Sequence, residues 1–353
     1  MNINFCGPIN NTGYGLASFN ILKALSGKNK IYYFPKGQPS VNTQQDYDFV
    51  VDLLNNQDDF DIHAPFIKIW HQFDLAERVG KGRYFAYPFF ELDSFNQREK
   101  KHLSVPDELF VSSNWAKDII LNNGICSIVN VAPLGVDVAT FNHEQYSMID
   151  QNKYVFLNIG KWEIRKGHDV LIDIFRKAFP SEEDVELWIV ASEHTNNYSS
   201  EEQLKEWKNK YLIDSRVKLS PGVDSQQDIA QIISQASCGV FMSRAEGWNL
   251  ELLECMAMNK PVIATDYSAH TEFCDKDNSY LVNITETERA YDGKAFVGQG
   301  NWAKIGQSQI DECVDYMRFV YKNRITNNSG GLKTAQKLSW NNTANIIEGC
   351  MSK

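Results

Sequence analysis

Short apolar segments alternate with helix-patterned segments along the chain, and this alternation restricts the fold more than any other feature. The apolar segments predict strands at residues 3–6, 31–34, 49–51, 66–70, 109–111, 128–131, 155–159, 187–190, 238–242 and 261–264. The segments between them have helical spacing, at residues 15–26, 169–178, 201–212, 228–236 and 250–258. Strands that are apolar throughout and separated by helices predict an α/β fold with parallel sheets covered on both faces.

The length and one polar break predict two doubly wound domains. The 353 residues correspond to about two domains of ordinary size. Residues 137–153 are polar and lack periodicity, so we expect an N-terminal domain over 1–145 and a second domain over 150–335. Residues 285–304 predict an irregular insertion. Sheets of this kind bind ligands at the carboxyl ends of strands where the strand order reverses, so two facing sheets predict a binding cleft.

Composition and charge exclude several classes of protein. The formal net charge of -10 argues against a nucleic-acid binder, which needs a basic surface, and against a polybasic membrane anchor. No apolar run reaches the length of a membrane span, and the first residues do not resemble a signal peptide. Seven scattered cysteines form no Cys-x-x-Cys pair, so we expect no zinc or other metal site and a cytoplasmic, reducing location. An oligomer remains compatible with the sequence.

Two glycine-containing loops follow predicted strands and could meet an anion. Residues 7–15 include Gly13, Tyr14 and Gly15 and precede a helix, so their backbone N–H groups could contact a phosphate or simply form a tight turn. Residues 160–167 carry Lys161, Arg165 and Lys166 after a buried strand. Three cations there suit a diphosphate, although a solvated loop with outward-pointing side chains is the alternative.

A third segment, residues 243–254, joins a predicted strand to a helix. Glu246 lies in the loop beside the free N–H groups expected at the helix start, and Glu254 follows eight residues later. These carboxylates could accept hydrogen bonds from sugar and ribose hydroxyls. Alternatively, Glu246 is a helix cap and Glu254 a charge on the helix surface.

Together these motifs resemble family 4 of the retaining GT-B glycosyltransferases, the glycosyl transferases group 1. The resemblance is strongest over residues 154–283, where residues 160–167 resemble the family's Gly-Arg…Lys-Gly loop, with Lys161 in place of Arg. Glu246 and Glu254 match its E-x7-E signature. The resemblance implies two Rossmann-like domains facing across a cleft, with the last helix, in residues 336–353, crossing back to the first domain.

The resemblance also implies roles for individual residues. Lys161 and Lys166 would stabilise the leaving diphosphate, with Arg165 beside them. Glu246 would contact the transferred sugar and Glu254 the nucleotide ribose. Backbone donors would come from the run Gly247, Trp248, Asn249 and Leu250, in which Asn249 replaces the family's small glycine and could add a hydrogen bond or change which sugar fits.

The first half matches the family less closely. Gly13, Tyr14 and Gly15 would lie near the donor phosphates, and residues 133–137 match the family's Pro-Leu-Gly-Val-Asp before the hinge. Residues 87–93 lack the histidine that many members carry there. Glu91 is our candidate catalytic replacement, and His71 is a second candidate.

We therefore expect a retaining, metal-independent hexosyltransferase that needs no cofactor. GDP-mannose is the first donor to test and UDP-glucose the second. The acceptor would be a glycan, a glycoprotein or a lipid-linked sugar. Two alternatives stay open, namely a GT-B-like nucleotide-sugar epimerase and a non-catalytic protein that binds a sugar nucleotide or a glycan.

Overall fold

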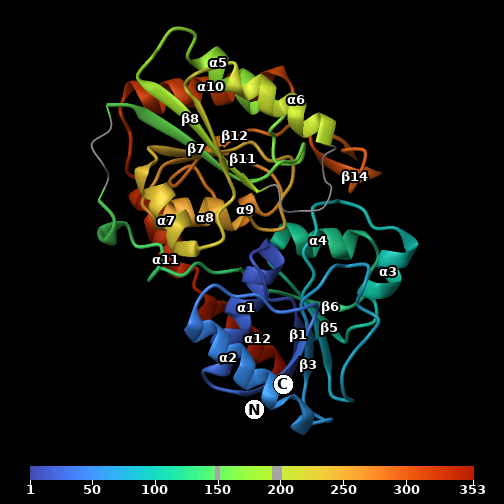
Figure 1. The fold of residues 1–353 in the computed structure, drawn as a ribbon. Helices are drawn as coiled ribbons and strands as arrows, with labels where there is room; N and C mark the ends of the chain where they lie inside the picture. The colour runs from blue at the N-terminus through green and yellow to red at the C-terminus, as the bar shows by residue number, and fades with distance from the viewer. Residues whose placement is uncertain (148–151, 193–200) are drawn as a thin grey trace. The chain divides into compact units, whose positions relative to one another are not determined.

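The structure, a computed structural model, describes residues 1–147, 152–192 and 201–353 and divides into two compact units (Figure 1). Unit 1 consists of Met1–Phe90, Ser94–Gly135 and Leu338–Lys353, and unit 2 of Glu91–Asp93 and Val136–Lys337. Each unit contains a six-stranded sheet in which every pairing is parallel. The predicted α/β class is therefore confirmed.

Unit 1 has the strand order β2-β1-β3-β4-β5-β6, which reverses between β1 and β3. Its strands are β1 (Asn2–Gly7), β2 (Lys30–Pro35), β3 (Phe66–Lys68), β4 (Tyr84–Ala86), β5 (Glu108–Val111) and β6 (Ile128–Val131). Its helices are α1 (Gly13–Ser26), α2 (Gln44–Asn55), α3 (Gln97–Leu103), α4 (Asn114–Asn122) and α12 (Trp340–Met351), with a 3-10 turn η1 (Gln57–Asp59). A ligand crevice in such a sheet is expected where the order reverses, at the carboxyl end of β1.

The last helix of the chain belongs to unit 1, where α12 packs beside α1 (Figure 1). Ser339 caps α12 by accepting from the Asn342 backbone N–H, which satisfies one of the unpaired donors at the helix start. Asn29, just after α1, donates to Glu348 at 3.2 Å, and the Thr343 hydroxyl donates to the Pro133 carbonyl at 2.6 Å. These contacts join the two ends of the sequence within one unit.

Unit 2 has the strand order β12-β11-β10-β7-β8-β9, which reverses between β7 and β10. Its strands are β7 (Tyr154–Lys161), β8 (Val185–Ser192), β9 (Val217–Pro221), β10 (Cys238–Phe241), β11 (Val262–Thr265) and β12 (Tyr280–Val282), with a separate antiparallel pair β13 (Thr287–Tyr291) and β14 (Val297–Ala303). Its helices are α5 (Leu171–Ala178), α6 (Glu201–Leu212), α7 (Gln226–Gln235), α8 (Leu250–Ala257), α9 (His270–Phe273), α10 (Gln307–Lys322) and α11 (Ser329–Lys337), with a 3-10 turn η2 (His143–Gln145).

The unit 2 sheet is covered on both faces, as its apolar strands require. Helices α5 and α10 lie side by side on one face, and α8 and α11 pack together on the other (Figure 1). Phe175 of α5 and Met317 of α10 share a fully buried core with Phe156 and Val240 of the sheet. This packing fixes the carboxyl ends of β7 and β10, which carry two of the motifs described above.

The structure corrects two expectations about local structure. Residues 49–51 lie in α2, not in a strand, because Thr43 caps a helix whose buried residues Val50 and Leu53 are three apart. A three-residue apolar run does not distinguish the two structures. Residues 285–304 form the β13–β14 hairpin, not an irregular insertion, and their glycines adopt the positive φ that the turns and a bulge require.

Candidate functional site

Two loops of unit 2 meet at the point where its strand order reverses. The first loop, residues 162–167, follows β7, whose last residue is Lys161, and the second, residues 242–249, follows β10 and leads into α8. Since β7 and β10 are parallel neighbours, their carboxyl ends lie at the same edge of the sheet. The Arg244 backbone N–H donates to the Arg165 carbonyl at 2.7 Å and ties the loops together.

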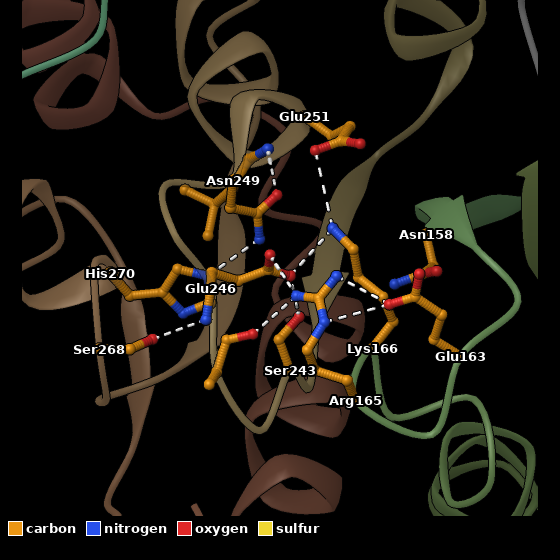
Figure 2. Close-up of polar contacts among 12 residues, drawn as sticks. Asn158, Glu163, Arg165, Lys166, Ser243, Glu246, Asn249, Glu251, Ser268 and His270 are labelled. Atoms are coloured by element: carbon orange, nitrogen blue, oxygen red, sulfur yellow. Dashed lines mark hydrogen bonds and ion pairs between the residues drawn. The ribbon is translucent and has the colours of Figure 1, made fainter. Parts of the chain in front are cut away.

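The Glu246 carboxylate is the centre of the resulting cluster (Figure 2). Oε2 accepts from Arg165 Nη1 at 2.7 Å, whereas Oε1 lies 2.9 Å from Lys166 Nζ and accepts from the Ser243 hydroxyl at 2.7 Å. The Glu246 backbone N–H donates to the Ser268 hydroxyl at 2.8 Å. The residue is only 4% exposed. Burial alone would raise the pKa of Glu246, but Arg165 and then Lys166 outweigh it and hold the pKa below its ordinary value, so the group is ionised at neutral pH.

The three cations predicted in the first loop have different surroundings. Arg165 and Lys166 are buried and pair with Glu246, and Lys166 also lies 3.8 Å from Glu251. Burial disfavours the Lys166 ammonium, but Glu246 outweighs burial and raises its pKa. Lys161 is half-buried, and desolvation lowers its pKa despite the attraction of Glu163. A nearby anion would relieve that cost.

Asn249, which stands where the family has a glycine, makes hydrogen bonds within the protein, to His270 and to the backbone of α8. Its backbone is left-handed, with φ 84°, and its side chain accepts from the Leu252 backbone N–H, which caps α8. Its Nδ2 lies 2.9 Å from Nε2 of the buried His270, whose Nδ1 lies 2.9 Å from the Thr265 carbonyl. Because that carbonyl can only accept, Nδ1 carries the proton and Nε2 accepts from Asn249. Burial lowers the pKa of His270, which favours this neutral form.

The other residues predicted on α8 and its preceding turn are largely buried. Glu254 is 6% exposed, and burial raises its pKa well above the ordinary value. No hydrogen bond or ion pair reaches its carboxyl group from the described residues. Trp248 packs on Phe273 with ring centroids 4.7 Å apart, and Leu250 is buried. Only the backbone of the turn Gly247–Leu250 is therefore suited to bind an anion, at the start of α8.

Glu91 lies within unit 2, together with Leu92 and Asp93. Burial raises the pKa of Glu91, and the Glu246 carboxylate raises it further whereas the Arg165 guanidinium opposes the rise, so Glu91 interacts electrostatically with the same cluster. Asp93 accepts from the backbone N–H and the side chain of Asn301 in β14, at 2.7 and 3.1 Å.

The remaining predicted residues lie in unit 1. Gly13, Tyr14 and Gly15 open α1, and the Tyr14 hydroxyl donates to the Phe89 carbonyl at 2.6 Å. His71 is part of an aromatic cluster, with its ring 4.4 Å from that of Tyr14 and stacked on Phe73. The structure thus groups Tyr14 with His71, and groups Lys161, Arg165, Lys166, Glu246, Asn249 and Glu91 in unit 2.

Sequence reasoning missed the residues that support the cluster. Arg244 binds both carboxylate oxygens of Asp169 at 2.8 Å, Glu288 at 3.0 Å and the Ile164 carbonyl at 2.6 Å. Glu163 and His270 were missed as well. The sequence singled out Asn249, but nothing in its spacing indicated that His270 is its partner or which residues bind Arg244.

Two further features of the described residues bear on cofactors and membranes. No group of three or more His, Cys, Asp or Glu side chains among them is arranged to hold a metal ion. None of the helices in the described ranges is long and apolar enough to cross a membrane.

Comparison with known proteins covers the second unit best. Residues 153–293 match the family model of the glycosyl transferases group 1. An uncharacterised glycosyltransferase of Methanocaldococcus jannaschii is 29% identical over 123 residues, which are 35% of this chain and 28% of that protein. The MMP alpha-(1->4)-mannosyltransferase of Mycolicibacterium hassiacum is 26% identical over 203 residues, 57% of this chain and 46% of that protein. The matched region thus spans less than half the length of either curated relative.

A solved structure extends the likeness to the whole chain. The Anabaena protein HepE, in complex with UDP and glucose, superposes with a TM-score of 0.71 at 15% identity, over 100% of this chain and 99% of the other. At that identity the match concerns the fold. The chain therefore has the GT-B fold, and its residues 153–293 are similar to the glycosyl transferases group 1.

Proposed function

We propose that this protein is a retaining glycosyltransferase that moves a hexose from a nucleotide diphosphate sugar to a glycan or glycoconjugate. The observation that carries the proposal is the ionised Glu246 carboxylate, held between Arg165 and Lys166 at the strand reversal of unit 2. It lies inside the region that matches the group 1 glycosyltransferases.

The chemistry of sugar transfer requires stabilisation of a departing diphosphate and of positive charge on the sugar. Lys161 and Lys166 supply ammonium groups for the diphosphate, and the backbone N–H groups at the start of α8 supply further donors. The role predicted for the unit 1 residues Gly13, Tyr14 and Gly15 stays a prediction. No metal ion is required in this proposal, since these cations do the same electrostatic work.

Glu246 is suited to orient and stabilise the sugar. It is ionised, buried and fixed at both oxygens, so its negative charge is available to the positive charge that develops on the sugar. Retention at the anomeric carbon then follows if the departing phosphate takes the acceptor proton on the same face. Glu254, buried and without a partner among the described side chains, would bind the ribose diol of the nucleotide.

The mannosyltransferase relative supports mannose as the first sugar to test. GDP-mannose is accordingly the preferred donor, with UDP-glucose second, and the acceptor is a glycan, glycoprotein or lipid-linked sugar. We expect a donor panel in calorimetry to identify one nucleotide sugar that binds, and the product of transfer to keep the anomeric configuration of the donor.

The role of Glu246 has its own test. Glu246→Gln should lower turnover by about 100-fold while nucleotide affinity changes little, because the substitution removes a charge that acts on the sugar. Glu77→Gln, on an exposed glutamate of unit 1, is the matched control. Unchanged turnover in Glu246→Gln would remove this residue from the site.

The alternatives give different results in the same assays. A nucleotide-sugar epimerase would release epimerised donor without any acceptor. A non-catalytic homologue would bind a donor or glycan tightly and show neither transfer nor hydrolysis.

A further inference from the structure

The Arg165 guanidinium is almost entirely occupied by acceptors from the protein itself. Its Nε and Nη2 donate to Glu163 Oε2 at 3.1 and 2.7 Å, and its Nη1 donates to the Ala245 carbonyl at 2.8 Å and to Glu246 Oε2 at 2.7 Å. These bonds use four of the five N–H donors of the group. The Arg165 side chain is 9% exposed and that of Lys166 is 8% exposed, so the bonds that each cation makes, and not its burial, distinguish the two.

Lys166 differs from Arg165 although it is the next residue. Its ammonium has three donors, and within the described residues it meets only Glu246 at 2.9 Å and Glu251 at 3.8 Å, of which the second is longer than a hydrogen bond. Donors are therefore left for an oxygen of a diphosphate. The two neighbouring cations thus have different capacities to bind an anion.

We propose that Arg165 is a positioning residue that fixes the Glu246 carboxylate for the sugar and does not bind the diphosphate. The proposal rests on the glycosyltransferase function proposed above and assigns this cation a different task from Lys161 and Lys166. The sequence of residues 160–167 predicted that Arg165 is one of the diphosphate ligands, and the proposal replaces that role.

The two oxygens of Glu246 explain why a separate positioning residue is useful. Oε1 depends on Lys166 and Ser243, and Lys166 is a group that a diphosphate would attract. Oε2 depends on Arg165, whose guanidinium also donates through Nη2 to Glu163 and is thereby fixed in place. Glu246 therefore keeps its orientation when a diphosphate draws Lys166 away. A lysine at position 165 could not do this, because one ammonium group lacks the planar fork that joins three acceptors.

The charges around Glu246 set the direction of a pH effect. Arg165 and Lys166 favour its carboxylate form, and His270 does so only when it is protonated, whereas Glu91 acts as a like charge. Loss of Arg165 removes the largest of the favourable charges, so the pKa of Glu246 rises. Because the carboxylate is the active form, activity should then be lost at a higher pH as the solution is acidified.

The experiment compares Arg165→Gln with Lys166→Gln. Calorimetric titration with GDP and with UDP measures nucleotide affinity, and donor turnover measures kcat between pH 4.5 and 8. For Arg165→Gln we expect nucleotide affinity within about threefold of wild type, kcat lowered at least tenfold, and an acid limb moved to higher pH. For Lys166→Gln we expect nucleotide affinity lowered at least tenfold, as for a lost charge-assisted bond.

A second variant protects the test against a folding defect in Arg165→Gln. Glu163→Gln keeps the Arg165 guanidinium but removes the negative charge that fixes its orientation. We therefore expect kcat to fall while nucleotide affinity is retained. Arg165→Lys should not rescue kcat, whereas a purely structural need for a buried cation would be met by lysine.

Several results would overturn the positioning role. Equal losses of nucleotide affinity in Arg165→Gln and Lys166→Gln would make Arg165 a phosphate ligand. An unshifted pH profile with normal kcat would show that Glu246 does not depend on Arg165. Wild-type protein that binds neither GDP nor UDP, and turns over no donor, would instead overturn the proposed function and the positioning role with it.

Discussion

Asn249 combines three structural tasks, and replacing it by alanine should therefore cost more than replacing it by glycine. Loss of the α8 cap costs about 1 kcal/mol for alanine but only a few tenths for glycine. The left-handed backbone, φ 84°, costs an alanine about 1 kcal/mol more and a glycine nothing. Both changes leave His270 Nε2 without its donor, at about 2 kcal/mol for a buried acceptor.

The sums are about 4 kcal/mol for Asn249→Ala and about 2 kcal/mol for Asn249→Gly. Unit 2 has about 200 residues, for which 1 kcal/mol shifts the unfolding midpoint by about 2–4 °C. Calorimetry should therefore show shifts of about 8–16 °C and about 4–8 °C. Ser225→Ala is the matched control, because Ser225 caps α7 with an ordinary φ of -90° and should cost only the capping contribution. An Asn249→Ala variant that loses no more stability than Ser225→Ala, or that is as stable as Asn249→Gly, would contradict these costs.

Three further substitutions test the site and its scaffold. Gly15→Ala should destabilise unit 1, because the new Cβ would lie 2.2 Å from a side-chain atom of the preceding loop. Gly13→Ala is the control: its Cβ would meet no atom within 4 Å, so the unfolding midpoint should stay that of wild type. Gly167→Ala should lower the unfolding midpoint and turnover together, because φ is +80° and the Cβ would lie 2.3 Å from the Met242 carbonyl oxygen. Glu254→Gln should leave stability unchanged near pH 4 and raise it increasingly toward pH 8 in thermal melts, because burial raises the pKa of Glu254 and its ionisation opposes folding as pH rises. A glutamine variant no more stable than wild type at pH 8 would show that this carboxyl group is not desolvated as the structure indicates.

Most helices and strands could be predicted where an apolar pattern was clear and polar residues bounded it on both sides. Helix 201–212 and strand 128–131 have the predicted bounds, and the strand at 187–190 is the middle of the longer β8. The prediction failed where the pattern was short or rich in glycine. Residues 49–51 are three apolar positions without a period, and the Thr43 cap and the burial of Val50 and Leu53 distinguish a helix there. The β13–β14 hairpin was missed because glycine weakens a strand pattern even where a bulge and turns require it.

The candidate site could be predicted in composition but not in pairing. The sequence singled out Glu246 and the three cations, and the family resemblance gave Lys161 and Lys166 the diphosphate with Arg165 beside them, but it indicated no protein partner for any of the three. The partners of Arg165 and Lys166 differ because of how the loops after β7 and β10 meet, which no spacing rule encodes. Likewise His270 lies 21 residues after Asn249 and follows a different strand, so their contact depends on the pairing of β10 with β11.

An acidic chain is proposed here to bind an anionic substrate, and the pairing of carboxylates with cations in this cluster explains how it can do so. Glu163, Glu246 and Glu251 alternate with Arg165 and Lys166, so the buried cations are stabilised by protein carboxylates before any ligand arrives. Unpaired, such cations would carry a large desolvation cost. Glu246 and Glu251 both lie near Lys166, but only Glu246 is within hydrogen-bond distance, so the ammonium group keeps further N–H donors for a ligand. The site can thus accept a diphosphate through Lys166 without breaking the Arg165–Glu246 pair. Because the cations are already desolvated in the folded protein, binding does not add the free-energy cost of burying them.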